Sequence, residues 1–431
     1  MTPSERERYE VEARPAVLIR RTDLPVPLDH PALSYVGGLP KLPSDLEWPR
    51  AELNANVAKP EETVALTFLA QIDLAELPDF DGRQLLPDEG TLFFFCSSVF
   101  EGVPDPPCEV LYYPESVATL PQTEAPPDLM PLAGEGGEYQ VKWLEKGTDF
   151  YASVEFKYPV TFAVFDDFLA YEPDGSELRL QSLCGALAAG EPVAAGGRSY
   201  EREHNLPQDE EWPFNWAVIT HMTRSVLHRA ADGLTSYPFR KPSSEDVRQT
   251  LLSVCESAQK WLDSASGRGP FEQVIAADKQ SFRAWRFGVA DSYNKMDAKA
   301  SARPTRGLGD MLPIIEHNIK LLAAQGQDTL AQAPQKYVED IKIRNRWFVP
   351  CYMHGRYLKP SMAIHQILGY GKAVQGAPFE HRDDLLLLQL QGDRAFFPWH
   401  SNIGCVLQFW IRREALLDYG FDSVEATLEC G

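Results

Sequence analysis

The sequence predicts an α+β fold in which both ends of the chain build a β-rich body and a helical block is inserted between them. Short β-branched or aromatic runs bounded by Pro, Gly and Asp occupy residues 33–174 and return after Trp347. From about Trp212 the prolines thin out and apolar residues recur with a period near 3.6. The expected parts are an N-terminal arm, two segments of one discontinuous body, and the helical insertion, at residues 1–32, 33–211, 350–431 and 212–349.

The predicted strands share apolar, β-branched or aromatic content between turn-forming residues. They are Leu66–Leu74, Thr91–Val99, Glu109–Pro114, Gln140–Gly147, Val160–Phe168, Leu385–Leu390, Cys405–Ile411 and Val424–Cys430. A further strand is expected in the arm, at Ala16–Arg20. Arg413–Gly420 reads as a short helix that ends at its glycine.

The clearest helix of the insertion begins after Ser243, where Ser243 and Asp246 resemble a capping box. Its predicted buried face consists of Val247, Leu251, Val254, Cys255, Ala258, Trp261 and Leu262. Gly267–Pro270 should end this helix, because Gly and Pro break the helical pattern. Similar patterns predict further helices at Asn215–Asp232, Phe271–Asp297, Leu312–Leu322 and Pro334–Arg346.

The composition limits the possible partners and location. The net charge of −21 argues against nucleic acid, because phosphate binding needs clustered Lys and Arg. An acidic surface would attract a basic protein, although it also simply keeps a protein dispersed. The sequence contains no apolar run long enough to span a membrane and no secretory h-region after its charged start, so we expect a cytoplasmic protein that does not enter membranes.

Seven cysteines are spread thinly and include no C-x-x-C pair. The odd number and wide spacing predict free, mostly buried thiols rather than a disulfide framework or a structural zinc site. We expect no metal and no cofactor. The glycine-rich turns at Gly37–Gly38 and Gly369–Gly371 do not open a helix with a phosphate-binding pattern. The sequence also contains no G-x-S-x-G nucleophile elbow.

The two ends of the chain share a weak internal repeat. Around Gln71, an apolar strand that contains the glutamine is followed by a loop, and Gly90 then opens an aromatic strand. Around Gln389 the same order occurs, with Gly404 before the next strand. A duplicated β unit and coincidence both explain this, because glycine often opens a strand.

Several segments carry a family likeness. They are Gly37–Pro49, Leu66–Pro78, Gly90–Phe95, His365–Gly376, Leu386–Leu390, Gly404–Leu416 and Thr427–Cys430. Together they make the chain resemble the YwqG-like proteins, a bacterial family of unknown function. The resemblance implies an α+β fold on antiparallel or mixed sheets and no established activity. Family genes occur among toxin–immunity neighbourhoods, which implies a protein-binding role. The departure from the family is the long helical block.

The densest polar group near predicted strand ends supplies a candidate cleft. Its members are His365, Gln366, Gln389, Asp393 and His400, with Gln71 as a convergent partner from the other end. One interpretation is a ligand-binding or hydrolytic site, in which His400 would act with Cys405 as base and nucleophile. The other is structural: buried amides pair with the backbone, because leaving one unpaired costs about 1–3 kcal/mol.

Three functions remain open from the sequence. The first is a non-enzymatic binding protein of immunity type, whose acidic surface would cap a basic toxin domain. The second is the small-molecule or hydrolytic cleft, and the third is a scaffold that docks through the helical insertion. Tryptophans are enriched at interfaces, so the candidate contact residues are Trp48, Trp399, Trp261 and Trp285, with core or loop packing as the alternative.

Overall fold

The computed structural model describes residues 13–52, 63–97, 105–129, 154–169, 179, 182–183, 185, 211–236, 245–299, 311–345, 352–353, 356–357, 364–392 and 405–430. The chain divides into two compact units. The β-rich unit consists of Met1–Glu138, Ala152–Ser199 and Asn345–Gly431, and the helical unit of Tyr139–Tyr151 and Tyr200–Arg344. The predicted α+β fold class is confirmed.

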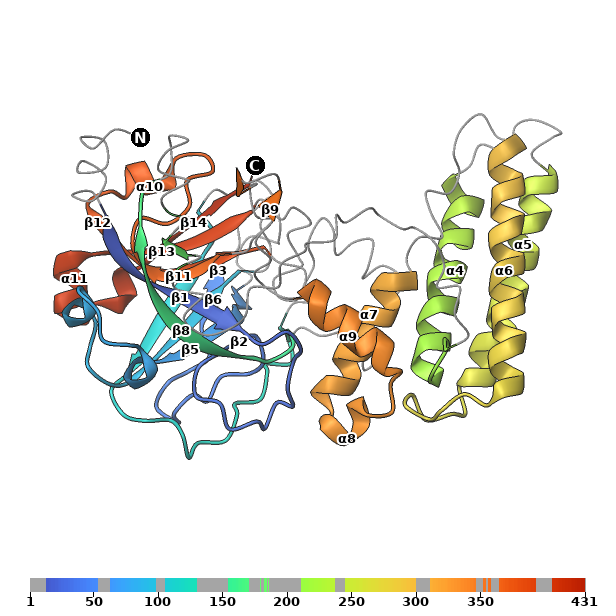
Figure 1. Cartoon of the computed structure of the whole chain (residues 1–431), viewed down its shortest axis with the longest axis horizontal. Helices are drawn as coiled ribbons and strands as arrows, with labels where there is room; N and C mark the ends of the chain where they lie inside the picture. Colours follow the sequence, from blue (N-terminus) through green and yellow to red (C-terminus); the bar gives the residue numbers. More distant parts are fainter. Residues whose placement is uncertain are drawn as a thin grey trace. The chain divides into compact units, whose positions relative to one another are not determined.

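The β-rich unit is organised around a ten-stranded sheet with the order β14-β13-β12-β11-β1-β8-β2-β5-β6-β7 (Figure 1). All of the pairings between these strands are antiparallel. The strands of the sheet are β1 (Arg14–Arg21), β2 (Tyr35–Val36), β5 (Thr67–Asp73), β6 (Thr91–Cys96), β7 (Cys108–Tyr113), β8 (Tyr158–Asp167), β11 (His365–Leu368), β12 (Asp384–Gln391), β13 (Val406–Arg412) and β14 (Glu425–Glu429). Two small hairpins, β3 (Arg50–Glu52) with β4 (Thr63–Ala65) and β9 (Tyr352–Met353) with β10 (Arg356–Tyr357), are separate.

The strand predicted at Ala16–Arg20 is β1, and it is a central strand of this sheet. It pairs with β8 on one side and with β11 on the other. Its residues Ala16 to Ile19 are fully buried, since both faces of β1 are covered. The sequence predicts a separate arm here, but the pairing of β1 places the strand inside the body. A short apolar run does not reveal which strands will flank it.

The ends of the sheet approach each other, so the sheet is nearly closed. Edge strand β7 contacts the 3₁₀ turn η4 (Phe421–Ser423) that precedes the opposite edge strand β14. The Tyr112 ring of β7 lies 5.3 Å from the Phe421 ring, measured between centroids. Inside, Phe94 of β6 meets Phe409 of β13 edge to face at 5.3 Å, so the two ends of the chain share one hydrophobic core.

The helical unit contains α4 (Trp216–Ser236), α5 (Glu245–Ala265), α6 (Ala276–Lys299), α7 (Met311–Ala324), α8 (Gln327–Leu330) and α9 (Gln335–Asn345). On α5 the predicted inner positions Val247, Leu251, Val254 and Ala258 are buried against α4 and α6, as the period of 3.6 requires. The predicted helices correspond to α4, α5, α6, α7 and α9, whereas the single turn of α8 was missed. Among the described residues, no helix is both long and apolar enough to cross a membrane.

Some predicted features cannot be compared with the structure. The predicted strand Gln140–Gly147 and the capping residue Ser243 lie outside the described residues. The short strand β11 is not among the predicted strands, because it has four residues and no alternating pattern.

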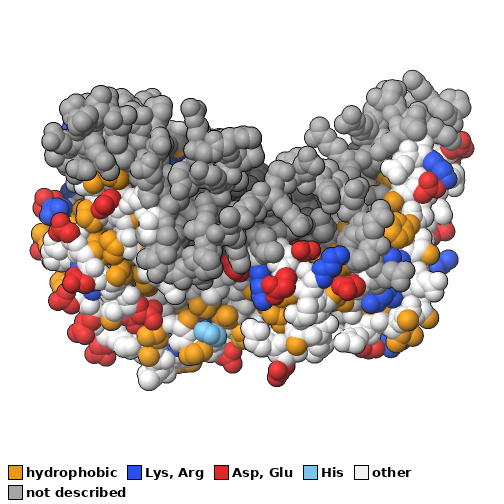
Figure 2. Space-filling view, in the orientation of Figure 1, with side chains coloured by type: hydrophobic (Ala, Val, Ile, Leu, Met, Phe, Trp, Pro, Cys, Tyr) orange, Lys and Arg blue, Asp and Glu red, His pale blue; other side chains and the backbone are white. Residues whose placement is uncertain are grey.

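The two units differ in charge. Between Thr63 and Leu129 the described residues include a single basic side chain, Arg83, against eleven carboxylates. These are Asp73, Glu76, Asp79, Asp81, Asp88, Glu89, Asp105, Glu109, Glu115, Glu124 and Asp128. Helices α4 to α9 instead carry twelve acidic and thirteen basic residues, which nearly cancel. Figure 2 shows acidic side chains with few basic ones along the lower left margin of the β-rich unit, and both signs on the helical unit.

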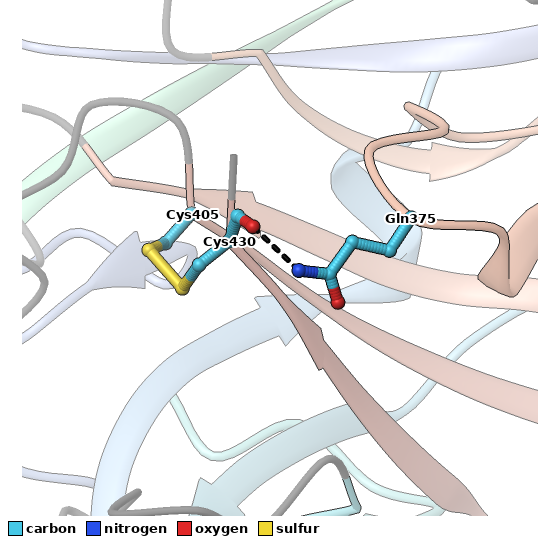
Figure 3. Close-up of a disulfide and its surroundings, with 3 residues drawn as sticks. All are labelled: Gln375, Cys405 and Cys430. Atoms are coloured by element: carbon cyan, nitrogen blue, oxygen red, sulfur yellow. Dashed lines mark hydrogen bonds between the residues drawn. A yellow bond between two sulfur atoms is a disulfide. The ribbon is translucent and has the colours of Figure 1, made fainter.

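Cys405 and Cys430 form a disulfide, which corrects the prediction of free thiols for this pair (Figure 3). The bond joins adjacent strands, because Val406 of β13 pairs with Glu429 of β14 and so brings the two cysteines opposite each other. A separation of 25 residues gives no hint of this register. Nearby, Gln375 Nε2 donates a hydrogen bond to the Cys430 carbonyl at 2.6 Å. Of the other cysteines that the structure describes, Cys96, Cys108 and Cys255 are free thiols.

Candidate functional site

A row of three glutamines crosses neighbouring strands on one face of the sheet. Gln366 on β11 pairs in register with Gln389 on β12, which pairs with Gln408 on β13. All three are fully buried. His365 precedes Gln366 on the same strand, and its side chain therefore points to the opposite face. The structure thus brings Gln366 and Gln389 together and separates His365 from both.

The Gln366 amide belongs to a buried ion-pair network. Its Nε2 donates to Asp167 Oδ2 at 2.8 Å, and its Oε1 accepts from Arg179 Nη2 at 2.5 Å. Arg179 Nε lies 2.7 Å from Asp167 Oδ1, and the two side chains are 6% and 0% exposed. The network therefore links β8, β11 and Arg179 through buried polar contacts.

The Asp167 carboxylate has no capacity left for a substrate. Oδ2 also accepts from the backbone N–H groups of Tyr370 and Gly371, at 2.8 and 3.0 Å, and Oδ1 accepts from that of Phe168 at 3.0 Å. With Gln366 this makes four hydrogen-bond donors, and Arg179 adds an ion pair, whereas a carboxylate offers about four lone-pair positions. The group is thus a structural anchor for the turn after β11 rather than a general base.

The glycine at position 369 is required by this anchor. Gly369 has φ of 78°, a left-handed conformation that glycine adopts at little cost. A Cβ atom there would lie 2.6 Å from Asp167 Oδ2. The turn can therefore approach the carboxylate only without a side chain, which explains the GYG sequence that the predicted turn contained.

Gln71 and Gln389 do not converge on one cleft. Gln71 lies on β5, and β2, β8, β1 and β11 separate that strand from β12. Each glutamine nevertheless makes the same hydrogen bonds in its own half. The Oε1 of Gln71 accepts from Lys41 N at 3.0 Å, and that of Gln389 accepts from Lys372 N at 2.7 Å. The corresponding Nε2 groups donate to Leu33 O and to Ile364 O. These pairings match the structural interpretation of both amides.

Further correspondences favour a duplicated β unit over coincidence as the explanation of the repeat. The pairings of β5 and β12 have a register shift at equivalent places, between Phe68 and Ala70 and between Leu386 and Leu388. Ser34, directly before β2, and His365, the first residue of β11, also match: Ser34 Oγ accepts from Asp73 N, and His365 Nδ1 accepts from Gln391 N. His365 therefore fixes a strand in the way that a serine does in the other half.

One detail of the predicted repeat needs correction. The residue equivalent to Gly90 is Cys405 rather than Gly404, since Leu74 N donates to Gly90 O and Gly392 N donates to Cys405 O, both at 2.9 Å. Cys405 is thus a strand-opening residue held in a disulfide. A disulfide sulfur carries no thiolate, so Cys405 in this state cannot serve as the nucleophile that one hypothesis required.

The remaining candidate residues are placed as follows. Asp393, His400 and Trp399 lie outside the described residues. Trp48 is half-buried: its Nε1 donates to Leu66 O at 2.8 Å and its ring meets Phe95 edge to face. Trp261 and Trp285 are half-buried against each other and Phe282 in the helical unit. Within the described ranges, no group of three or more His, Cys, Asp or Glu residues is arranged to hold a metal ion.

The sequence reasoning missed a buried histidine pair between α4 and α7. The ring centroids of His221 and His317 lie 5.5 Å apart, and Asn318 Nδ2 lies 3.0 Å from His221 Nδ1. Burial, with Lys320 as a smaller cause, lowers the pKa of His317 to about 4. Burial and the neighbouring His317 also lower the pKa of His221 well below its usual value. Both rings are therefore neutral in the folded unit near pH 7.

We expect the helical unit to lose stability as the pH falls from about 6.5 toward 4. A histidine whose pKa is lowered by folding binds a proton more readily in the unfolded chain. Its contribution to the free energy of unfolding is therefore present above about pH 6.5 and is lost as the pH falls below that value. For His317 this loss is about 2–3 kcal/mol at pH 4.5. Chemical unfolding followed by circular dichroism at about pH 7 and about pH 4.5 measures it, with His317→Gln expected to make the dependence shallower while His221 keeps the remainder. The half-buried His228 supplies the control: if His228→Gln flattened it equally, the assignment to His317 would be wrong.

Comparison with known families gives one match. A family model described as a domain of unknown function, DUF1963, matches residues 34–430, nearly the whole chain. The match includes Gln71 and Gln389 and the residues Lys41 and Lys372, whose backbone N–H groups donate to these amides. No curated protein matches the chain.

Proposed function

Because the chain belongs to the DUF1963 family, whose function is unknown, we propose its function from its surface: it is a binding protein whose β-rich unit recognises a basic protein. The observation that carries this proposal is the charge of the described residues between Thr63 and Leu129, which include eleven carboxylates and a single basic side chain, Arg83. Complementary charge accelerates encounter and selects a partner. The negative charge of this segment also disfavours nucleic acid and anionic membranes as partners, because both would be repelled.

The candidate cleft gives little support to an enzyme. The carboxylate Asp167 is saturated, and the buried amides of Gln366 and Gln389 are bonded within the protein. Amides neither accept nor release protons in general acid–base catalysis. A hydrolytic or small-molecule cleft with Asp393 and His400 is therefore the weaker proposal, and so is a scaffold role for the helical insertion.

The finer parts of the proposal concern family and biology. We propose that the family is the YwqG-like one that the motifs resemble, and that the protein acts in the bacterial cytoplasm. There it would be of immunity type, neutralising a basic toxin domain by covering it.

Co-expression with the products of adjacent genes tests the proposal. We expect a complex with a basic protein, with an association rate that falls by about tenfold between about 50 and 300 mM salt, because steering by exposed charges is screened. Isothermal titration and stopped-flow mixing give affinity and rate. Absence of any complex, or a rate independent of salt, would remove the support for a basic partner.

A further inference from the structure

Two exposed apolar side chains stand at the place where the ends of the sheet meet. Leu417 and Tyr419 follow one another on and just after α11 (Arg413–Leu417), and they are 60% and 56% exposed. The Tyr419 ring stacks on Tyr112 of β7 with centroids 5.5 Å apart and an interplanar angle of 19°. Tyr112 in turn donates from its hydroxyl to Glu89 O at 3.1 Å. The Tyr419 ring is thus held against Tyr112 while more than half of the residue stays exposed.

The backbone at Tyr419 is in a conformation that favours glycine. Its φ is 56°, and the N–H of the next residue, Gly420, bonds back to Ala415 O at 2.8 Å as the chain leaves the helix. A tyrosine in this region is less stable than Gly or Asn, by about 1 kcal/mol. The stack on Tyr112 can offset this cost, and it holds the exposed ring in one place on the surface.

Exposed carboxylates lie on the segment that carries these apolar side chains and on the loop that contacts it. Helix α11 contacts the turn η2 (Arg83–Leu85), which places the loop from Asp79 to Glu89 beside it. The exposed acidic residues of the two segments are Asp79, Asp81, Asp88, Glu89, Glu414, Asp418 and Asp422. None of these is ion-paired with a Lys or Arg that the structure describes. Arg83 donates to four backbone carbonyls, and Arg412 and Arg413 lie at the start of α11.

We infer that this surface is the docking site for a protein segment in which arginines alternate with apolar side chains. We call it the seam patch, and it consists of Tyr112, Leu417, Tyr419 and the seven carboxylates. Apolar side chains of the partner would cover Leu417, and guanidinium groups would stack on the free face of Tyr419 and pair with the carboxylates. Arginine suits this surface better than lysine because its planar group stacks and pairs at once. The inference rests on the proposed function, since it locates the surface that takes the basic protein.

A peptide of about ten residues with alternating Arg and Leu tests the inference on the full chain. We expect saturable binding by fluorescence anisotropy at about 50 mM salt, at least fivefold weaker for Tyr419→Asn and for Leu417→Ser. The Asn variant suits the left-handed backbone, so it should keep the midpoint of thermal unfolding within about 3 °C. Weakened binding with unchanged stability would separate a docking role from a structural one.

Matched controls keep the outcome decisive. Leu28→Ser and Phe379→Ser change other exposed apolar residues of the β-rich unit, at 42% and 38% exposure, and should leave binding unchanged. A peptide with Glu in place of Arg should not bind. The inference is overturned if the native chain does not bind the Arg–Leu peptide. It is also overturned if both patch variants bind the peptide as tightly as the native chain does.

Binding of the partner found by co-expression distinguishes a wrong docking site from a wrong function. If that complex forms and the patch variants bind the partner as the native chain does, the docking site lies elsewhere while the proposed function stands. If no basic protein binds the native chain, the proposed function itself fails. If the patch variants lose the partner as well as the peptide, both hold.

Discussion

Replacing Asp167 with alanine should lower the free energy of unfolding of the β-rich unit by about 3–5 kcal/mol, the usual cost of leaving a buried charge without its partner. Arg179, with a side chain only 6% exposed, would lose the ion pair that compensates its burial. The backbone N–H groups of Tyr370 and Gly371 would lose their acceptor at the same time. Urea unfolding of the full chain, followed by its tryptophan fluorescence, measures the change as a shift in the transition of the β-rich unit.

The preceding residue provides a matched control. Asp166 is an exposed carboxylate on the same strand, because successive side chains of β8 point to opposite faces. Asp166→Ala should change stability by no more than about 0.5 kcal/mol. Equal effects of the two substitutions would show that the anchor adds nothing beyond surface charge.

The substitution Gly37→Ala should cost at least about 3 kcal/mol, from a strained backbone and a steric clash together. Gly37 has φ of 67°, and a Cβ atom there would lie 2.1 Å from the carbonyl oxygen of Phe156. Backbone cannot move aside as a flexible side chain can, so β2 would have to separate from β8. We expect a lower midpoint in thermal unfolding, or no soluble protein.

Gly288→Ala is the comparison for this second substitution. Gly288 lies within α6, and no atom comes within 4 Å of the position its Cβ would take. Alanine there should be neutral or stabilise by up to about 1 kcal/mol, because glycine is a poor helix former. A Gly37→Ala protein as stable as Gly288→Ala would contradict the close approach of β2 to Phe156.

The spacing of apolar residues predicted helices and strands well where the buried face of the element sets that spacing. The inner face of α5 follows from the spacing of Val247, Leu251 and Val254, and the buried run around Gln389 follows from its apolar neighbours. The interpretation of Gln71 and Gln389 as amides paired with the backbone also came from a local argument, since a polar group inside an apolar strand needs a partner.

Features that depend on long-range register could not be predicted in this way. Asp166 and Asp167 look alike in the sequence, and only the pairing of β8 with β1 buries the second one. Its partner Gln366 is 199 residues away. The disulfide likewise depends on the pairing of β13 with β14, and the exposure of Tyr419 depends on a single backbone angle that no spacing reveals.

The central position of β1 has a consequence for synthesis on the ribosome. β1 is made first, yet its neighbour β11 emerges only after the whole helical unit. Until then the nascent chain carries an apolar strand with one edge unoccupied, and such edges invite pairing with other chains. Termination of translation anywhere before His365 would leave that edge bare permanently, so truncated products of this gene should aggregate rather than persist as folded fragments.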